Sequence, residues 1–254
     1  MLCVSLYLRA SVVPQVSVRE RMVKLPILTV LMPDNTLKPL AIYGAGGLGR
    51  EIAVMVEQIN QEERCWRLEG FYDDGIQRGT VVDGLPVIGG IEDVNSAGSR
   101  LSLVIAIADP LTRKILVEKI ANDNIDFPIL VHPQEIPGGE TNYFGQGSIV
   151  TAGCILTTGV VLGDFTIINL ASTLGHDVKL GSFSIVMPGC NISGNVTVGE
   201  CSLVGTGAKI LQNLELGKNC TVGAGAVVTK SFGDGVTVVG VPAEPYRGDT
   251  KGTG

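Results

Sequence analysis

The sequence is short of aromatic residues, which together with its many glycines favours a repetitive β-architecture over a helical bundle, and it is also short of positive charge. Aromatic residues make up 5% of the 254 residues, and 19 lysines and arginines stand against 25 acidic residues, a formal net charge of −6. Nucleic acids and anionic membranes attract proteins through an excess of basic side chains. We therefore expect neither a nucleic acid nor a membrane surface as a partner.

Long apolar runs and metal-ligand spacing are also missing. No stretch approaches the roughly 18 apolar residues of a membrane-spanning helix, so we expect no membrane insertion and a cytoplasmic location. The 6 cysteines form no Cys-x-x-Cys pair and have no neighbouring histidine, which argues against a bound metal and favours reduced thiols. Residues 1–37 lack the basic segment of a secretion signal and are predicted to form a flexible extension.

Glycine and a six-residue aliphatic repeat are what the sequence has in excess. The 34 glycines are nearly twice the usual share of about 7%. From Val150 to Val228, every sixth residue is isoleucine, leucine or valine. The repeated positions are Val150, Leu156, Leu162, Ile168, Leu174, Leu180, Val186, Ile192, Val198, Val204, Ile210, Leu216, Val222 and Val228. A strict period of six predicts a solenoid built from short parallel strands.

A second period, of eighteen residues, sets three strands to a coil. Glycine follows the aliphatic anchor once per coil, at Gly145, Gly163, Gly181, Gly199 and Gly217. Four positions after the anchor, two of the three hexads in each coil carry a small residue and the third carries a larger apolar one, which predicts a triangular prism with inward anchors and small side chains at its corners. Cys154, Cys190 and Cys220 are then small apolar fillers of that interior. Residues eighteen apart are expected to stack about 4.8 Å apart along the axis.

The first half of the chain is predicted to be a small α/β unit. A strand over 40–44 is followed by the glycine-rich turn Gly44-Ala-Gly46-Gly47-Leu-Gly49 and by a helix over 49–61. Glycines between a strand and a helix are typical of sites that bind nucleotide phosphates. The next strand ends at Asp73-Asp74, an acidic pair suited to ribose hydroxyls. The candidate substrate-binding residues are Gly44, Gly46, Gly47, Asp73 and Asp74. A tight turn that only allows close helix–sheet packing explains the same glycines without a ligand.

Together, the six-residue repeat and the turn Ile42-Tyr43-Gly44-Ala45-Gly46-Gly47 resemble one family, the hexapeptide-repeat sugar O- and N-acyltransferases of the sialic acid and UDP-bacillosamine type. The resemblance covers residues 40–245. It implies a Rossmann-like nucleotide-sugar domain over residues 38–133, a left-handed parallel β-helix over residues 140–247 and a tail over 248–254. It also implies an enzyme without a metal that uses acetyl-CoA as co-substrate, assembles as a homotrimer and holds acetyl-CoA between adjacent subunits.

Acyl transfer from a thioester needs a base for the acceptor's proton and hydrogen-bond donors for the oxyanion. The resemblance places the base in the segment Asn169-Leu-Ala-Ser-Thr-Leu-Gly-His176-Asp177. It implies His176 as general base, Asp177 as its hydrogen-bond partner and Asn169 as a residue that positions the acceptor. Gly194, one coil beyond His176, is the candidate oxyanion donor and also contacts the donor thioester. Each of these polar residues also has an ordinary explanation, as an exposed surface residue or as one that satisfies a coil corner. The other histidine, His132, is expected to be structural.

A column of small residues is the candidate site for the donor. The resemblance places Gly205, Thr206, Gly223 and Ala224 beside the pantetheine arm of acetyl-CoA, although small residues also serve merely to turn coil corners. The segment 239–243 looks like the family's closing motif near that arm. The chain departs from the family at Leu48, where relatives commonly carry a histidine that engages the acceptor.

The sequence therefore predicts an acetyl-CoA-dependent acyltransferase that acts on a nucleotide-activated amino sugar or a sialic-acid-like sugar by direct transfer. Two alternatives stay open at this point. The glycine-rich unit fits an NAD(P)-dependent oxidoreductase that uses the β-helix as a trimerisation platform. It also fits a non-catalytic sensor of sugar nucleotides.

Overall fold

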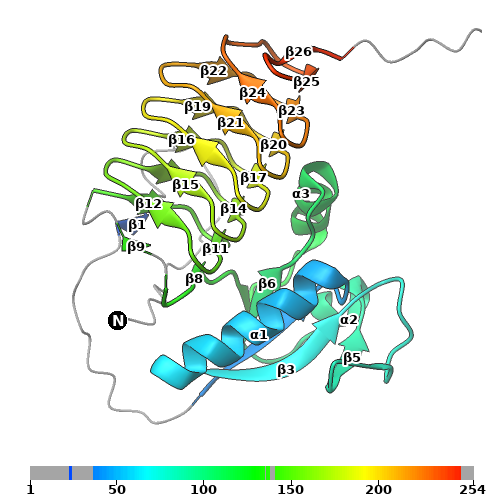
Figure 1. Ribbon diagram of the computed structural model, residues 1–254. Helices are drawn as coiled ribbons and strands as arrows, with labels where there is room; N and C mark the ends of the chain where they lie inside the picture. Colours follow the sequence, from blue (N-terminus) through cyan, green and yellow to red (C-terminus); the bar gives the residue numbers. More distant parts are fainter. Residues whose placement is uncertain (1–22, 25–36, 135, 138–140, 247–254) are drawn as a thin grey trace, which may run out of the picture.

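The computed structural model describes residues 23–24, 37–134, 136–137 and 141–246. They form an α/β unit followed by a β-helix whose coils stack in one regular column (Figure 1). The predicted combination of an α/β domain with a parallel β-helix is confirmed. The predicted extension over residues 1–37 and the tail over residues 248–254 lie outside the described residues, except for residues 23–24 and 37.

The α/β unit has a sheet of strand order β4-β5-β3-β2-β6-β7. Its elements are β2 (Lys38–Tyr43), α1 (Gly47–Glu62), β3 (Trp66–Tyr72), β4 (Val81–Val82), β5 (Leu85–Gly89), α2 (Ile91–Asn95), β6 (Leu101–Ile105), α3 (Pro110–Lys119) and β7 (Ile125–Asp126). All pairs are parallel except β4 with β5. This order reverses between β2 and β6, and α/β sheets bind ligands beyond the carboxyl ends of the strands at such a point.

Three sheets form the faces of the β-helix, and we number them 1 to 3. Sheet 1 contains β1 (Val23–Lys24), β10 (Tyr143–Phe144), β13 (Val161–Leu162), β16 (Lys179–Leu180), β19 (Thr197–Val198) and β22 (Glu215–Leu216). Sheet 2 contains β8 (Leu130–Val131), β11 (Ile149–Val150), β14 (Ile167–Ile168), β17 (Ile185–Val186), β20 (Leu203–Val204), β23 (Thr221–Val222), β25 (Thr237–Val239) and β26 (Glu244–Pro245). Sheet 3 contains β9 (Ile136–Pro137), β12 (Ile155–Leu156), β15 (Thr173–Leu174), β18 (Asn191–Ile192), β21 (Lys209–Ile210) and β24 (Val227–Val228).

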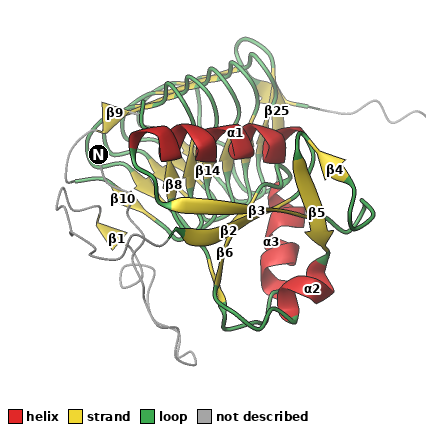
Figure 2. Ribbon diagram, turned by 90° about the horizontal axis from the view of Figure 1, so that it is seen from below, coloured by secondary structure: helices red, strands yellow, loops and turns green. Residues whose placement is uncertain are grey.

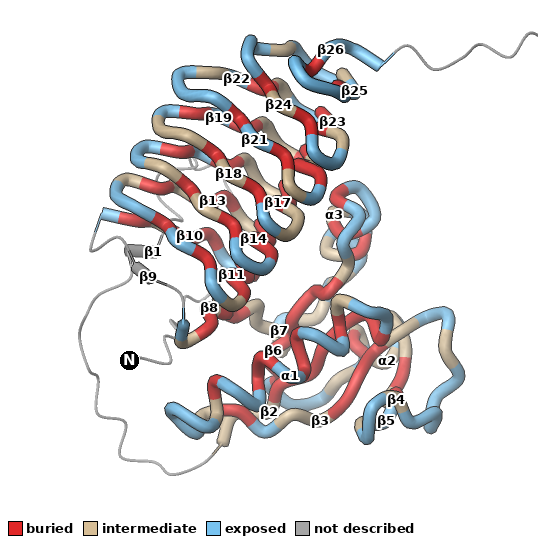
Figure 3. Tube along the Cα trace, in the orientation of Figure 1, coloured by how far each residue is buried: buried red, intermediate tan, exposed pale blue. Residues whose placement is uncertain are grey.

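The aliphatic repeat forms the interior of the prism. All fourteen anchors from Val150 to Val228 are at most 3% exposed and belong to one hydrophobic cluster. Figure 3 shows buried strands alternating with more exposed turns along the coils. Strands pair with a register of eighteen residues, as between Ile167 and Ile185. The recurrent glycine is required by this stacking, because a Cβ on Gly163 would lie 2.5 Å from the backbone nitrogen of Ser182.

Helix α1 joins the two units, because it lies between the sheet of the α/β unit and sheet 2 of the β-helix (Figure 2). Its buried side chains recur at helical spacing, with Ile52, Val56 and Ile59 on one stripe. Those residues share a hydrophobic cluster with the outward-facing isoleucines of sheet 2, Ile149, Ile167 and Ile185. A strand buried on both faces is apolar at both of its residues, which is why Ile167 and Ile168 are adjacent.

Candidate active site

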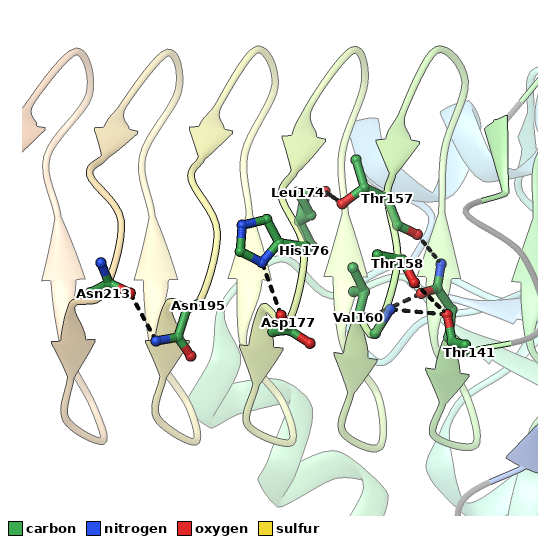
Figure 4. A network of polar contacts seen from close by, with 11 residues as sticks. Thr141, Thr157, Thr158, Val160, Leu174, His176, Asp177, Asn195 and Asn213 are labelled. Atoms are coloured by element: carbon green, nitrogen blue, oxygen red, sulfur yellow. Dashed lines mark hydrogen bonds and ion pairs between the residues drawn. The ribbon is translucent and has the colours of Figure 1, made fainter.

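His176 and Asp177 lie in the turn between β15 and β16, at the corner where sheet 3 meets sheet 1 (Figure 4). Both side chains are exposed, and His176 Nδ1 lies 2.9 Å from Asp177 Oδ2. A carboxylate only accepts hydrogen bonds, so a neutral His176 carries its proton on Nδ1 and leaves the lone pair of Nε2 available. The turn is held by backbone bonds to both adjacent coils, from Asp177 N to Thr158 O and from Asn195 N to His176 O.

Two glycines on the neighbouring coils make room for this pair. A Cβ on Gly194 would lie 2.3 Å from His176 Nε2, and a Cβ on Gly159 would lie 2.6 Å from Asp177 Oδ1. The imidazole therefore lies against the bare backbone of one coil and the carboxylate against that of the other. Within the described chain, no backbone oxygen accepts a hydrogen bond from the Gly194 amide. Sequence reasoning missed Gly159, although its spacing of eighteen residues from Asp177 is visible in the repeat.

Asn169 lies at a different corner, where sheet 2 meets sheet 3. Its side chain is 5% exposed, and its Oδ1 accepts hydrogen bonds from Leu170 N at 2.8 Å and from Thr151 Oγ1 at 3.5 Å. Its Oδ1 thus closes the coil corner. Within one chain the structure does not bring Asn169 together with His176.

The column predicted for the donor follows the same corner as Asn169. Gly205 and Thr206 lie between β20 and β21, and Gly223 and Ala224 lie between β23 and β24. A Cβ on Gly223 would lie 2.8 Å from Val239 Cγ1, so the predicted closing motif packs on the end of this column. Thr206 and Ala224 are exposed. The width of sheet 3 separates the column from the His176 corner of the same chain.

The four glycines of the turn after β2 divide into two pairs. Gly44 has φ +102°, and a Cβ there would lie 2.9 Å from Ala106 O, while a Cβ on Gly49 would lie 1.8 Å from Gly44 O. Close helix–sheet packing therefore accounts for Gly44 and Gly49. It does not account for Gly46 and Gly47, where a Cβ would meet nothing within 4 Å. These two leave the N-terminus of α1 open, with no side-chain cap and no acidic residue in the first turn.

The acidic pair has partners within the protein. Asp73 accepts hydrogen bonds from Ala45 N at 2.9 Å and Gly75 N at 2.8 Å, and so fixes the glycine-rich turn. Asp74 accepts from Tyr43 Oη at 2.6 Å and from Ile91 N at 2.9 Å. Burial, and then Asp74, raise the pKa of Tyr43, which stays a neutral donor. Every oxygen of the pair thus already accepts one hydrogen bond, and the sequence carried no sign of this.

Two other residues singled out by the sequence have packing roles. Leu48, the residue at which the sequence is predicted to depart from the family, packs against the hydrophobic cluster around α1. His132 is 4% exposed, accepts a hydrogen bond from Gln134 N at 3.0 Å through Nδ1, and contacts Gln58 Oε1 at 2.9 Å through Nε2. Burial lowers its pKa.

Neither a metal centre nor a membrane-spanning helix is found in the described part of the chain. Among these residues, no three histidine, cysteine, aspartate or glutamate side chains are grouped to hold a metal ion. None of the described helices is long and apolar enough to cross a bilayer.

Comparison with known families and solved structures gives consistent matches in both halves of the chain. Residues 39–120 match the PglD N-terminal domain, and residues 195–230 match the bacterial transferase hexapeptide family of six repeats. No curated protein matches the chain significantly.

Among solved structures, the acetyltransferase domain of PglB from Neisseria gonorrhoeae FA1090, in complex with acetyl coenzyme A, is 35% identical with a TM-score of 0.75. That match covers 83% of this chain and 100% of that chain. WeeI from Acinetobacter baumannii AYE is 30% identical with a TM-score of 0.69, covering 82% and 100%. A variant of perosamine N-acetyltransferase from Caulobacter crescentus, in complex with CoA and GDP-perosamine, is 27% identical with a TM-score of 0.74, covering 84% and 98%.

Proposed function

This chain belongs to the hexapeptide-repeat sugar acetyltransferases, and from that premise we propose that it moves the acetyl group of acetyl-CoA to the amino group of a nucleotide-linked amino sugar. One observation carries the proposal: His176 and Asp177 form an exposed pair, 2.9 Å apart, against the bare backbone of Gly194. Acyl transfer from a thioester requires such a base beside an amide donor. The perosamine N-acetyltransferase structure, which holds CoA and GDP-perosamine, supports an amine as acceptor.

Transfer proceeds in one displacement at the thioester carbonyl. The acceptor nitrogen forms the new bond to the carbonyl carbon, His176 Nε2 takes its proton, and the Gly194 N–H donates to the oxyanion. Asp177 stabilises the imidazolium formed at that moment. The carbon–sulfur bond then breaks, and His176 returns the proton to the departing CoA thiolate. A positioned base contributes about 10²–10⁴-fold in such reactions, and one oxyanion donor about 10²–10³-fold.

The arrangement of the corners supports a site shared between copies of the chain. His176 occupies the corner opposite sheet 2, whereas the α/β unit covers sheet 2 and the Thr206 column borders it. In a closed threefold ring with sheet 3 facing the axis, the His176 corner of each copy meets the Thr206 corner of the next. A homotrimer therefore unites the base of one copy with the donor column and sugar site of its neighbour.

The sugar nucleotide is assigned to the edge of the α/β unit where β2 and β6 diverge. Gly46 and Gly47 leave the amides of α1 open to a phosphate, and the helix dipole favours negative charge at this end. Asp73 holds the glycine-rich turn that shapes this edge, and Asp74 holds Tyr43 and the start of α2 beside it. Each carboxylate oxygen of the pair already accepts one hydrogen bond, so a ribose hydroxyl that donates to Asp73 or Asp74 binds to a second lone pair of that oxygen.

The test is release of free CoA thiol from acetyl-CoA with a panel of UDP-, GDP-, dTDP- and CMP-linked sugars. Each 4-amino sugar is paired with its 4-hydroxy counterpart, and CMP-linked sialic acid is included. Thiol release that requires an amino sugar, with an amide in the product, is the expected result. Release only with a hydroxyl acceptor contradicts the choice of nitrogen, and no release with any sugar despite acetyl-CoA binding contradicts the proposed acceptor class.

A further inference from the structure

Arg113, in the first turns of α3, is a fully buried arginine for which the mechanism above has no use. Its side chain is 0% exposed, and no carboxylate among the described residues forms an ion pair with it. The guanidinium instead donates to five backbone carbonyls. These bonds run from Nε to Phe165 O (3.1 Å), from Nη1 to Ile107 O and to Ala108 O (3.1 Å), and from Nη2 to Phe183 O (2.6 Å) and Ser184 O (3.1 Å).

The acceptors on the β-helix mark the two ends of one coil. Phe165 and Phe183 are eighteen residues apart, in successive turns at the corner where sheet 1 meets sheet 2, and their rings stack with centroids 5.2 Å apart. The coil between them carries Asn169 at its first corner and His176 at its second. One guanidinium therefore closes the coil that holds the proposed base.

The acceptors on the α/β unit belong to the ligand-binding edge of its sheet. Ile107 and Ala108 follow β6, on one side of the point where the strand order reverses. Gly44, on the other side, lies so close that a Cβ there would be 2.9 Å from Ile107 Cδ1. Arg113 thus connects this edge directly to the coil.

The chemistry of this contact indicates that Arg113 fixes the position of the α/β unit relative to the β-helix and does more than hold the two units together. An apolar side chain would bury this interface at no cost in charge, whereas burial lowers the pKa of Arg113 to about 10 and still leaves it charged at neutral pH. Only a planar guanidinium supplies five donors with fixed directions. Five directed bonds to two units fix both distance and orientation, which apolar packing alone leaves looser.

We propose that Arg113 is a positioning residue, which holds the nucleotide-binding edge of the α/β unit in register with the coil that carries Asn169, at the corner where the His176 of the neighbouring copy is proposed to lie. The inference rests on the proposed function, because that edge is taken to bind the sugar nucleotide. A displacement of about 1 Å at a reacting group costs about a hundredfold in rate. Arg113 therefore acts on transfer to the nucleotide-linked sugar and not on acetyl-CoA.

The test compares Arg113→Lys with Lys114→Met. Lysine keeps the charge but lacks the planar fork, and Lys114 is a matched control because it forms the neighbouring contact between the same units, an ion pair with Glu200 at 2.7 Å. For Arg113→Lys, kcat/KM for the nucleotide sugar is expected to fall about a hundredfold. The KM for acetyl-CoA and the slow thiol release to a small untethered amine stay at wild-type values. For Lys114→Met, the change is expected to stay within about fivefold.

Equal kinetics of Arg113→Lys and Lys114→Met, or a parallel loss with the small amine, overturn the positioning role. If Arg113→Lys does not fold, Arg113→Ala is refolded with guanidinium or with ammonium at equal ionic strength. Recovery of transfer to the nucleotide sugar with guanidinium alone supports the proposal, and recovery with both or with neither contradicts it. Wild-type protein that transfers to no nucleotide sugar overturns the proposed function instead, which separates the two failures.

Discussion

The reactivity proposed for His176 depends on neighbours that have no side chain. Gly194 lets the imidazole lie against the next coil, and Gly159 lets the Asp177 carboxylate lie against the preceding one. The bare backbone of these two glycines gives both side chains room to take the positions in which their 2.9 Å hydrogen bond forms. Both glycines are thus part of the candidate site, although Gly159, unlike Gly194, contacts no reacting atom.

Substitution of Gly159 tests this directly. In Gly159→Ala the new methyl displaces Asp177 Oδ1 and weakens the hydrogen bond to His176. We expect kcat to fall by roughly ten- to a hundredfold, since a hydrogen bond to a charged group is worth about 1.5–3 kcal/mol, with the KM for acetyl-CoA unchanged. Gly235→Ala is the matched control, because Gly235 has the same φ, +71° against +70°, and open space around its Cβ. Equal losses of kcat in both variants would mean that backbone strain, not Asp177, sets the effect.

His132 is expected to make the free energy of unfolding depend on pH. Burial holds its pKa below the unfolded value of about 6.5, so on acidification the unfolded chain binds a proton before the folded protein does. The free energy of unfolding is therefore expected to decrease as the pH falls below about 6.5, and the full contribution of His132 is present above that value. Urea unfolding of wild-type protein and His132→Gln between pH 7.5 and 5 checks this. A wild-type slope as flat as that of the variant contradicts the assignment.

At the N-terminus of α1, the residue that best stabilises the helix differs from the residue that best lets an anion approach. The N-cap residue, Gly46, has φ −76° and no side chain that could accept a hydrogen bond from the first helix amides. Asparagine or aspartate at a helix N-cap is usually favourable, by roughly 0.5–2 kcal/mol over alanine and by a few tenths over glycine. A glycine at this position therefore makes sense where an anion must approach the helix amides.

Gly46→Asp and Gly46→Asn separate the two demands. Both are expected to keep or slightly raise the melting temperature, because both cap the helix. Only aspartate places a negative charge where the phosphate is proposed to bind, so the KM for the nucleotide sugar is expected to rise at least tenfold with aspartate and much less with asparagine. Equal KM values for the two variants would remove the phosphate from this helix end.

How far the sequence predicts these elements differs between the two halves. The anchors of the β-helix could be predicted residue by residue, because each coil repeats one local rule and all fourteen anchors are buried. The internal partners of Asp73 and Asp74 could not, since they come from segments that are distant in the chain. Arg113 also gave no signal, because an arginine in an amphipathic helix is typical of a solvated face.

The placement of the candidate residues on separate corners points to a functional unit larger than one chain. His176 and Gly194 share one corner, while Asn169 and the Thr206 column share another. The sequence places all of them in one repeat, and its spacing of seven between Asn169 and His176 already indicates different corners. In the proposed trimer these corners meet across neighbouring copies, and periodicity within one chain carries no information about such an assembly.

Mixed assemblies test the shared site. His176→Ala removes the base, and Thr206→Trp blocks the donor column at an exposed position. Each variant alone is expected to be inactive. Coassembled at a one-to-one ratio, they are expected to recover about a quarter of wild-type activity, because random cyclic trimers unite an intact His176 with a neighbour's intact Thr206 in that share of sites. No recovery in mixtures shown to contain mixed trimers means that each chain forms its site alone.

The central claim is that His176 is the base for acetyl transfer, and the most direct measurement is the single-turnover rate of thiol release by His176→Ala at saturating acetyl-CoA and nucleotide sugar. Lys179→Ala, an exposed change on the same coil, is the control. A fall of about 10²–10⁴-fold in the histidine variant alone, with acetyl-CoA binding retained, is the predicted result. A rate within a few-fold of wild type would remove His176 from the chemistry and contradict the mechanism.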